Sequence, residues 1–437
     1  MISESISLIK TRDVMKKSRV YTGNIMILGA VQLIETIAIA LPMSFFPKYI
    51  IGLGASVASV GLFTSSFMIA SAMLSPKMGS LTDKYGRKKL LMLGIGSDVV
   101  LGTLTGLVPS WEWLLLIRLL NGAVSSAAML ASETLLFDTV DPARRGEASG
   151  FILSMRGIGR NIGPLLGGSI QWYSMSRGAT ELMSFRIPYF VDSAFALVAL
   201  VIVFLKITEP ERMIPHTMGM KGPMADGPRF KLSREIKILL ANGFVSGIGV
   251  GFIIPIMVLF YTDKFGTSSV EIGAIFSISG FIGLIASWIA GRFSDKLGRK
   301  PLIALGNYSS RAMGFAIPLM PDIISTGIVQ SVRSLGFNIG MPAFRALRAD
   351  LVPAGIRGRV FGLFSTSFTA GSVLGPIIST WIYSAYRSEV FHLMGISVPG
   401  YGIPFFINSV LGILSTTMVM LFVEEPRKQD LIEELPL

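Results

Sequence analysis

The chain has no cysteine and only two histidines among its 437 residues. Without cysteine it can form no disulfide, no thiolate metal site and no cysteine nucleophile. His216 and His392 fall in expected loops, so a proton relay inside the protein has to use carboxylates. No Gly-Lys dipeptide occurs, which excludes a P-loop for ATP. These absences argue against an enzyme and against an ATP-driven pump, and we expect neither a metal nor another cofactor.

Charge is also scarce. Charged residues make up 15% of the chain and hydrophobic residues 51%, whereas a soluble globular protein carries about 25% charged residues. About twelve apolar runs are each close to the ~20 residues that a helix needs to cross a bilayer. The runs are continuously apolar, unlike the alternating strands of a membrane barrel. The sequence therefore predicts an all-α integral membrane protein with twelve transmembrane helices, at 24–47, 56–76, 90–109, 112–136, 148–172, 185–206, 238–261, 268–290, 300–319, 322–345, 359–383 and 401–423.

Basic residues outnumber acidic ones, and the net charge is +12. Most of the 39 lysines and arginines fall in segment 1–23 and in every second loop after it. This asymmetry follows the positive-inside rule, so we expect both termini in the cytoplasm, a plasma-membrane location, and no nucleic-acid binding. The apolar run after segment 1–23 is too long for a signal peptide and is interpreted as a retained first helix. The predicted outer loops hold only Lys48, Arg177, Arg186, Lys264 and Arg387.

Two basic turns indicate an internal duplication. "GSLTDKYGRKK" at 79–89 and "GRFSDKLGRKP" at 291–301 carry identical residues at six equivalent positions, and the same offset in numbering pairs Gly-Pro at 163–164 with Gly-Pro at 375–376. A duplicated six-helix unit places a cavity between its two copies, near the bilayer midplane, which is a geometry of carriers. The sequence thus predicts a cytoplasmic segment at 1–23, six-helix halves at 24–206 and 238–423, a polar cytoplasmic linker at 207–237 and a cytoplasmic tail at 424–437.

These motifs resemble those of the major facilitator superfamily over essentially the whole chain. The basic turns are similar to that family's loop 2–3 signature and its second-half copy. "IRLLNGAVSSAA" at 117–128 is similar to the fourth-helix motif, and "GIGRNIGPLLGG" at 157–168 to the fifth-helix motif associated with antiporters. The resemblance implies the major facilitator fold, alternating access and export.

The resemblance also implies a role for the basic turns. Glycines allow a tight turn between helices, and in the resembling family the acid and the arginine of this turn stabilise the outward-facing state through contacts between the halves. The alternative is that these charges only set the topology. By residue match we expect a conformational latch at Gly79, Asp83, Gly86, Arg87, Asp138, Asp295, Arg299 and Asp350, and gate helices marked by Gly163, Pro164, Gly167, Gly375 and Pro376.

Ionisable residues at membrane depth are costly and usually functional. Glu35 lies about 11 residues into the first span, roughly 16 Å at 1.5 Å per residue, which is near the midplane. A carboxyl group removed from water can take up a proton, so we expect Glu35, Arg118 and Glu133 to couple protons to transport, with Arg118 exchanging partners with Glu35. The alternatives are a structural ion pair for Glu35 and simple access to interfacial water for Glu133. Asp192 is a weaker candidate because its repeat equivalent is Asn408.

Arginine is unusually frequent in the predicted spans, where a guanidinium needs a partner or a wet cavity. These arginines outnumber the three acids just named, which favours an anionic or zwitterionic cargo. The alternative for Arg156 and Arg311 is that they lie at misplaced span ends. The arginines concerned are Arg118, Arg156, Arg160, Arg311 and Arg333, and we expect Gln32, Arg156, Arg160 and Arg333 to line the substrate cavity.

The sequence therefore predicts a secondary active transporter, a proton-coupled antiporter of multidrug type that exports amphipathic small molecules by alternating access. Its expected partners are a small-molecule substrate, protons and the lipid bilayer, and we expect a monomer. Two alternatives stay open: a proton-coupled carrier of organic anions, suggested by the arginines, and a non-transporting receptor or scaffold of carrier ancestry.

Overall fold

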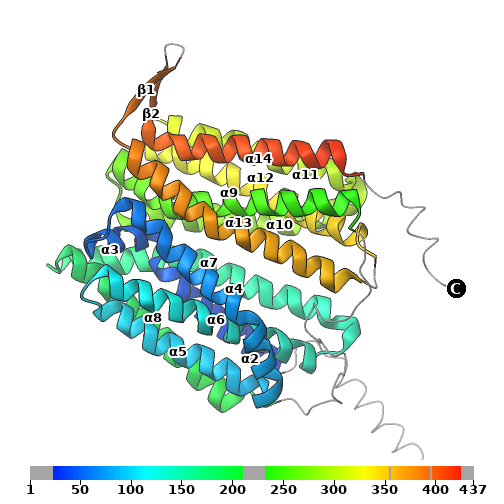
Figure 1. The fold of residues 1–437 in the computed structure, drawn as a ribbon. Coiled ribbons are helices and arrows are strands. Elements are labelled where there is room, and N and C mark those ends of the chain that lie inside the picture. Colours follow the sequence, from blue (N-terminus) through cyan, green and yellow to red (C-terminus); the bar gives the residue numbers. More distant parts are fainter. Residues whose placement is uncertain (1–22, 210–231, 354–355, 394–395, 425–437) are drawn as a thin grey trace, which may run out of the picture.

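The computed structural model describes residues 23–209, 232–353, 356–393 and 396–424. Within these ranges twelve long helices run side by side in two groups of six (Figure 1). The predicted twelve-helix, two-half fold is thereby confirmed. The N-terminal half comprises α2 (Gly23–Ala40), α4 (Val60–Tyr85), α5 (Arg87–Leu107), α6 (Trp111–Thr139), α7 (Arg145–Ser176) and α8 (Glu181–Lys206), with the short helices η1 (Leu41–Ser44), α3 (Phe46–Gly52), η2 (Val57–Ser59) and η3 (Pro142–Arg144).

The C-terminal half repeats this plan. Its first helix begins at Arg234, inside the segment predicted as linker, because Ser233 caps the helix by accepting a hydrogen bond from the backbone N–H of Ile236. The half comprises α9 (Arg234–Phe265), α10 (Ser269–Leu297), α11 (Arg299–Ala316), α12 (Ile323–Asp350), α13 (Arg357–Tyr386) and α14 (Ile403–Phe422), with the short helices η4 (Ile317–Leu319) and η6 (Gly400–Gly402).

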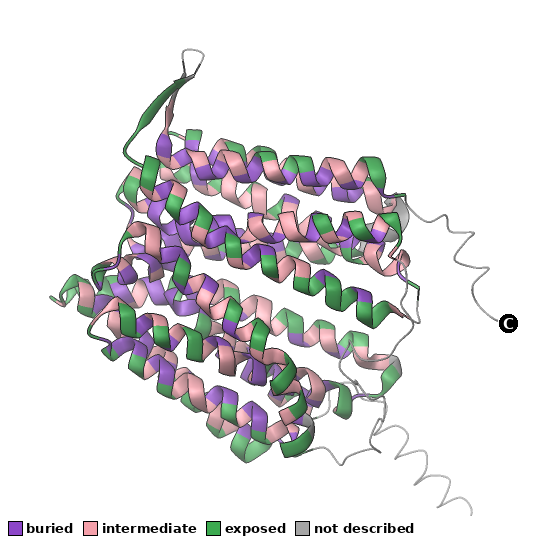
Figure 2. Ribbon diagram, in the orientation of Figure 1, coloured by how far each residue is buried: buried purple, intermediate pink, exposed green. Residues whose placement is uncertain are grey.

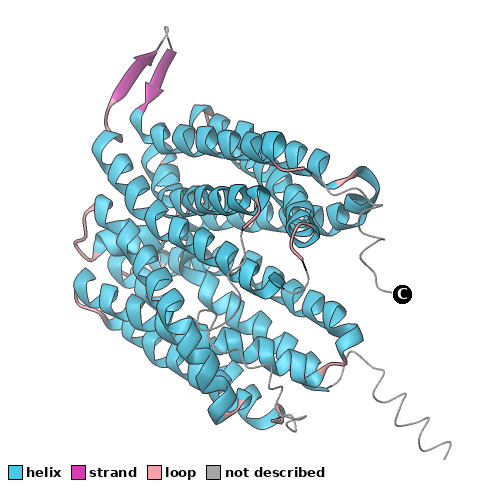
Figure 3. Ribbon diagram, turned by 45° about the vertical axis from the view of Figure 1, so that its right-hand side comes forward, coloured by secondary structure: helices cyan, strands magenta, loops and turns pink. Residues whose placement is uncertain are grey.

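A β-hairpin between α13 and α14 adds an element that the sequence did not predict. Strands β1 (Val390–Leu393) and β2 (Ile396–Pro399) pair antiparallel, and the hairpin projects beyond the helices (Figure 3). Valine, isoleucine and phenylalanine, which are enriched in strands, make up much of this loop. We call this end of the molecule the hairpin end, and the opposite end, which carries the turns at Gly86 and Gly298, the basic end.

The basic turns are the tightest connections in the fold. A single residue, Gly86, separates α4 from α5, and Gly298 separates α10 from α11. Their φ angles of 100° and 85° favour glycine over any residue with a side chain. The carboxylate of Glu209 accepts hydrogen bonds from the backbone N–H groups of Arg87 (2.6 Å) and Lys88 (2.8 Å), and so caps the start of α5. The turn thus connects the segment that follows α8, the last helix of the first half, to the start of α5.

The helices form a membrane-spanning bundle. Nine segments of the described chain are long and apolar enough to cross a bilayer. The other three long helices, α7, α11 and α12, are less apolar. They carry the arginines predicted at membrane depth, except Arg118, which lies on α6. Large apolar side chains such as Leu205, Trp288 and Ile324 are 65%, 65% and 73% exposed. Exposed residues recur along the long helices (Figure 2). This pattern suits contact with lipid rather than water.

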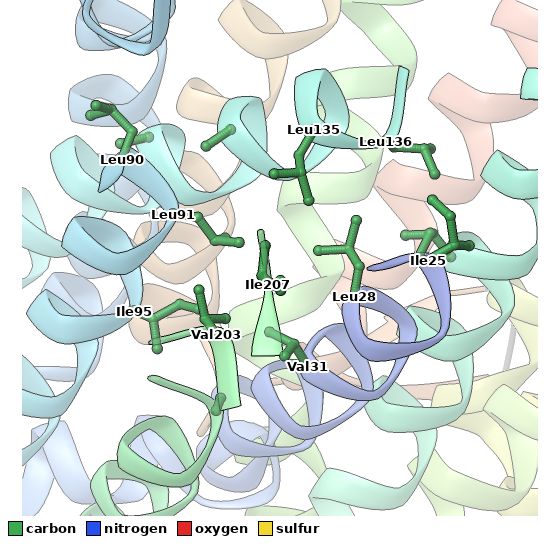
Figure 4. Close-up of a cluster of buried hydrophobic side chains, with 14 of the residues drawn as sticks. Ile25, Leu28, Val31, Leu90, Leu91, Ile95, Leu135, Leu136, Val203 and Ile207 are labelled. Atoms are coloured by element: carbon green, nitrogen blue, oxygen red, sulfur yellow. The ribbon is translucent and has the colours of Figure 1, made fainter. Parts of the chain in front are cut away.

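Each half has its own packed core. In the N-terminal half Leu28 from α2, Leu91 from α5, Leu135 from α6 and Val203 from α8 meet with no exposed surface (Figure 4). An equivalent cluster in the C-terminal half is built around Ile303. In lipid such clusters stabilise helix pairs by close packing, because lipid tails are as apolar as the side chains. The halves can therefore move as units.

The two halves meet at the hairpin end through a contact that repeats with the internal symmetry. Gly61 of α4 packs against the backbone carbonyl of Pro376 in α13, and Gly273 of α10 packs against the carbonyl of Pro164 in α7. The two glycines are equivalent in the sequence repeat, and so are the two prolines, which makes the contact pseudo-twofold. It is reinforced by the Ser65 hydroxyl, which donates to the Val373 carbonyl (2.6 Å).

Near the basic end, two glycines of α7 and α13 have no close neighbour among the described residues. Among the described residues, no atom of another element lies within 4 Å of where a Cβ would stand at Gly146 in α7 or at Gly358 in α13. These two glycines are also equivalent in the repeat. The contacts made by Gly61 and Gly273 thus join the halves at the hairpin end, and the equivalent glycines Gly146 and Gly358 face no described neighbour at the basic end.

Candidate functional site

A cavity of about 520 Å³ lies between the two halves. Its wall is largely apolar and includes five phenylalanines. The N-terminal half presents Phe46, Phe63 and Phe67, and the C-terminal half presents Phe276 and Phe337. A concave apolar site with a few polar groups, shared by two repeats of a carrier, has the form of a small-molecule site.

Among the described residues, every charged side chain that lines this cavity is an arginine. Arg118 of α6 and Arg160 of α7 come from the N-terminal half, and Arg311 of α11 and Arg333 of α12 from the C-terminal half. The Arg118 guanidinium lies 3.9 Å from the centre of the Phe46 ring, which holds it by a cation–π contact. The predicted cavity residues Arg160 and Arg333 thus lie at the cavity, together with Arg118 and Arg311.

The predicted cavity residues Gln32 and Arg156 do not belong to this lining. The Arg156 Nε donates to Gln32 Oε1 (2.6 Å), and its Nη1 lies 3.8 Å from Glu133 Oε1. This cluster joins α2, α6 and α7 within the N-terminal half. Arg156 and Arg160 are one turn apart on α7, and their side chains have different surroundings. Glu133 accordingly has a cation beside it, in the ion-pair arrangement of a structural contact.

Three carboxyl groups, those of Glu35, Asp98 and Asp192, interact with one another inside the N-terminal half. Glu35 of α2 is 7% exposed, and its Oε1 has no hydrogen-bond partner among the described residues. The Asp192 carboxyl of α8 lies beside Gly102 of α5, where a Cβ would be 3.1 Å from its Oδ2. Asp98 precedes Gly102 by one helical turn and shares its face. Asp98 and Asp192 act electrostatically on Glu35.

Arg118 connects the carboxyl cluster to the cavity. It lines the cavity and also acts electrostatically on Asp98 and Asp192. Its Nε has no hydrogen-bond partner among the described residues. The acids that interact with Arg118 are thus Asp98 and Asp192. The exchange of partners between Arg118 and Glu35 stays a prediction. Asp98 is absent from the sequence prediction, although an acid in the middle of the apolar run 90–109 is a detectable signal.

Among the latch residues whose side chains the structure describes, an arginine and an aspartate form an ion pair in each half. Arg87 Nε lies 2.8 Å from Asp138 Oδ2, and Arg299 Nε lies 3.3 Å from Asp350 Oδ2, at equivalent positions of the repeat. Both pairs connect helices of the same half. The side chains of Asp83 and Asp295 lie outside the described part of the structure. Gly79 lies on α4, one turn before Asp83.

The predicted gate residues divide by their contacts. Gly163 packs against Ala40 of α2 and Gly167 against the backbone of Leu41, so both serve close packing within the N-terminal half. Gly375 packs in the same way against Ile248 of α9. Pro164 and Pro376 present their carbonyls to the other half, as described above. The prolines therefore mark the contact between the halves.

Comparison with known proteins agrees with this architecture. The family model described as Major Facilitator Superfamily matches residues 28–234 and 239–435. The chain is 26% identical over 353 residues to the multi-drug resistance efflux pump PmrA of Streptococcus pneumoniae, covering 78% of this chain and 84% of that protein. It is 25% identical over 349 residues to multidrug resistance protein 2 of Bacillus subtilis, with coverage of 78% and 84%.

Solved structures share the fold. A bacterial homolog of the human lysosomal transporter Spinster, in an inward-facing and occupied conformation, superposes with a TM-score of 0.74 and 15% sequence identity, covering 92% of this chain and 96% of that one.

Proposed function

The chain belongs to the major facilitator superfamily, and from that premise we propose that it is a proton-coupled antiporter that exports amphipathic small molecules by alternating access. It is a multi-pass membrane transporter and not an enzyme. One observation carries the proposal: an aromatic-lined cavity between the halves is lined by Arg118, which also acts electrostatically on the acids Asp98 and Asp192 beside the buried Glu35. The relatives named as multidrug resistance proteins support export as the direction.

Alternating access is supported by the contacts between the halves. The contacts of Gly61 and Gly273 with the opposite proline carbonyls close the hairpin end, and at the other end Gly146 and Gly358 have no described neighbour within 4 Å. By the positive-inside rule the basic end faces the cytoplasm, so this conformation is inward-facing, in a plasma membrane with both termini inside. One chain forms the whole cavity, which favours a monomer as the working unit.

Proton coupling is supported by the carboxyl cluster. A proton on Glu35 removes a buried charge next to Asp98 and Asp192, and it leaves Arg118 as the partner of those two acids. Substrate in the cavity contacts Arg118 from the other side. Proton uptake and substrate binding therefore share one guanidinium, which is the physical requirement for coupling two ligands.

The test of this proposal uses purified protein in liposomes that contain a pH-sensitive dye. Addition of an amphipathic substrate is expected to start proton movement that empty liposomes do not show, and octane-1-sulfonate and tetraphenylphosphonium test an anionic and a cationic substrate separately. Binding of either probe without any proton movement would instead favour the receptor or scaffold alternative.

Asp98→Asn is expected to reduce substrate-driven proton movement about tenfold. Asparagine keeps the shape of the side chain but removes its charge, and a change of about 1.4 kcal/mol in one charge interaction alters a proton equilibrium tenfold. The dye assay measures the initial rate. Glu112→Gln, at the exposed start of α6, is the control and should keep the wild-type rate. A wild-type rate in Asp98→Asn would exclude Asp98 from coupling.

A further inference from the structure

Two half-buried arginines of the C-terminal half line the cavity and have no acidic partner among the described residues. Arg311 Nη1 donates to Asn408 Oδ1 (3.3 Å), and Arg333 Nη1 donates to Gln330 Oε1 (3.3 Å). Both acceptors are neutral amides. Among the described residues, no carboxylate lies within ion-pair distance of either guanidinium. The two arginines also act electrostatically on each other.

The packing around these arginines is specific. Arg311 lies against Gly412 of α14, where any side chain would overlap its guanidinium stem. Arg333 passes Gly314 of α11, with its Nε 3.5 Å from where a Cβ would stand. Glycine at 412 therefore gives the Arg311 side chain room to reach the cavity, while Arg333 is in ordinary contact with Gly314. The arrangement is a built feature of the half, on three neighbouring helices.

The internal repeat shows that the two halves differ in charge at equivalent positions. Asp98 of the N-terminal half corresponds to Ser310 in the register set by the basic turns, and Asp192 corresponds to Asn408. The acids that accompany Arg118 are thus replaced by neutral residues in the C-terminal half. On the helices of that half, described acids such as Asp263, Glu271 and Asp350 lie at helix ends rather than in the middle of the membrane span.

Two like charges at membrane depth are unfavourable unless an anion joins them. The described part of the protein provides no such anion here, so an anion bound in the cavity would be the partner of the two guanidinium groups. We propose that Arg311 and Arg333 bind the anionic head group of the transported molecule, a carboxylate, sulfonate or phosphate, while its apolar tail lies against the aromatic wall. This assignment of the substrate class rests on the proposed function as an exporter of amphipathic molecules.

The geometry of a guanidinium suits this role. Its planar fork donates two parallel hydrogen bonds to a carboxylate, sulfonate or phosphate, and such charge-assisted bonds are stronger than bonds between neutral groups. An amphipathic cation would meet four arginines in the same cavity and no compensating acid in the described lining. Specificity for anions therefore has an attractive and a repulsive component.

The experiment compares two probes that share one tail. Octane-1-sulfonate and octyltrimethylammonium carry the same eight-carbon chain and opposite head-group charges, and isothermal titration calorimetry measures their binding to the full chain in phosphatidylcholine nanodiscs. The wild type should bind the sulfonate at least tenfold more tightly. Arg311→Gln and Arg333→Gln should each weaken sulfonate binding about 10- to 100-fold. Arg333→Lys should recover part of the loss, because it keeps the charge but not the fork.

The matched control is Arg345→Gln, an exposed arginine on the same helix as Arg333, which should bind the sulfonate like the wild type. Adding phosphatidylglycerol to the nanodiscs distinguishes two sources of the head group, because a lipid that reaches the site should lower the apparent affinity for the sulfonate. Equal or tighter binding of the ammonium probe by the wild type would overturn the anion site, and this comparison needs no variant.

The binding measurement uses no proton gradient and no flux. A failure of the liposome assay alongside selective sulfonate binding would therefore overturn proton-coupled transport and leave the anion site standing. Wild-type sulfonate affinity in both glutamine variants would overturn the anion site while leaving the transport proposal intact.

Discussion

Glu35→Gln should abolish substrate-driven proton movement, with a loss of at least about a hundredfold. Glutamine has nearly the shape of the protonated glutamic acid but cannot exchange a proton, so the carrier is fixed in one charge state. Glu35 is 7% exposed and its Oε1 has no hydrogen bond among the described residues, so little packing or bonding is lost. The dye-loaded liposome assay measures the proton flux. Exchange of labelled substrate across the same membrane, which moves no net proton, should continue.

The comparison variant for this experiment is Glu133→Gln. Glu133 has Arg156 beside it at 3.8 Å and lies 44% exposed at its side chain, so its neutralisation should affect proton flux much less. A proton flux within twofold of the wild type in Glu35→Gln would remove Glu35 from the mechanism. Loss of substrate exchange together with proton flux would indicate a structural role for Glu35.

The fold could be predicted from the sequence because its determinants are additive along the chain. Each apolar run spans a bilayer by its length, and the repeat of the basic turns identifies the halves. The ends of the helices could not be predicted as well. α4 continues to Tyr85, past the predicted end at 76, because a helix can extend beyond the hydrocarbon core once its polar residues reach water. The hairpin at 390–399 depends on strand pairing between residues that carry no turn motif.

The site was predictable only in part because helical spacing identifies a face and not its neighbour. Arg156 and Arg160 share a face of α7 by spacing, and one contacts Gln32 of α2 while the other lines the cavity. That division depends on how α2 and α7 are aligned along each other. The acid Asp98 was detectable as a charge within an apolar run, yet its association with Asp192 requires the packing of α5 on α8.

The repeat also separates two roles that a sequence count of charges merges. The acids adjoining the cavity belong to the N-terminal half, and the arginines with only amide partners belong to the C-terminal half. A count of charged residues in the predicted spans suggests an anionic cargo and a proton-binding carboxyl group. It does not show that the acids lie in one half and these arginines in the other. In the proposed alternating-access mechanism, rocking changes the distance between the halves, and the charge asymmetry would then link protonation, substrate and conformation.

Gly61→Ala and Gly273→Ala should each shift the transporter away from the inward-facing conformation. In this structure the new methyl group would overlap the backbone carbonyl of Pro376 or of Pro164, and a backbone cannot move aside as a flexible side chain can. Overpacking at such a contact costs about 1–3 kcal/mol, which changes the ratio of two conformations roughly 5- to 150-fold. Because the chain has no cysteine, spin labels attach only to cysteines that are introduced. Ser176→Cys and Ser388→Cys place one label at the hairpin end of each half. Their distance distribution should move to longer values.

Gly146→Ala and Gly358→Ala are the matched controls, since they repeat the same chemical change at the basic end of α7 and α13, where a methyl group meets no described atom within 4 Å. In this conformation they add no overlap, so they should not lengthen the distance at the hairpin end. An unchanged distribution in both Gly61→Ala and Gly273→Ala would mean that the proline carbonyls do not hold the halves together. A lengthening of the same size in the controls would mean that helix propensity causes the effect, because alanine favours a helix over glycine by up to about 1 kcal/mol.

The symmetry of the contact gives one more expectation. Because the two glycines and the prolines they oppose are equivalent in the repeat, Gly61→Ala and Gly273→Ala should act in the same direction, and the double variant should have a larger effect than either alone.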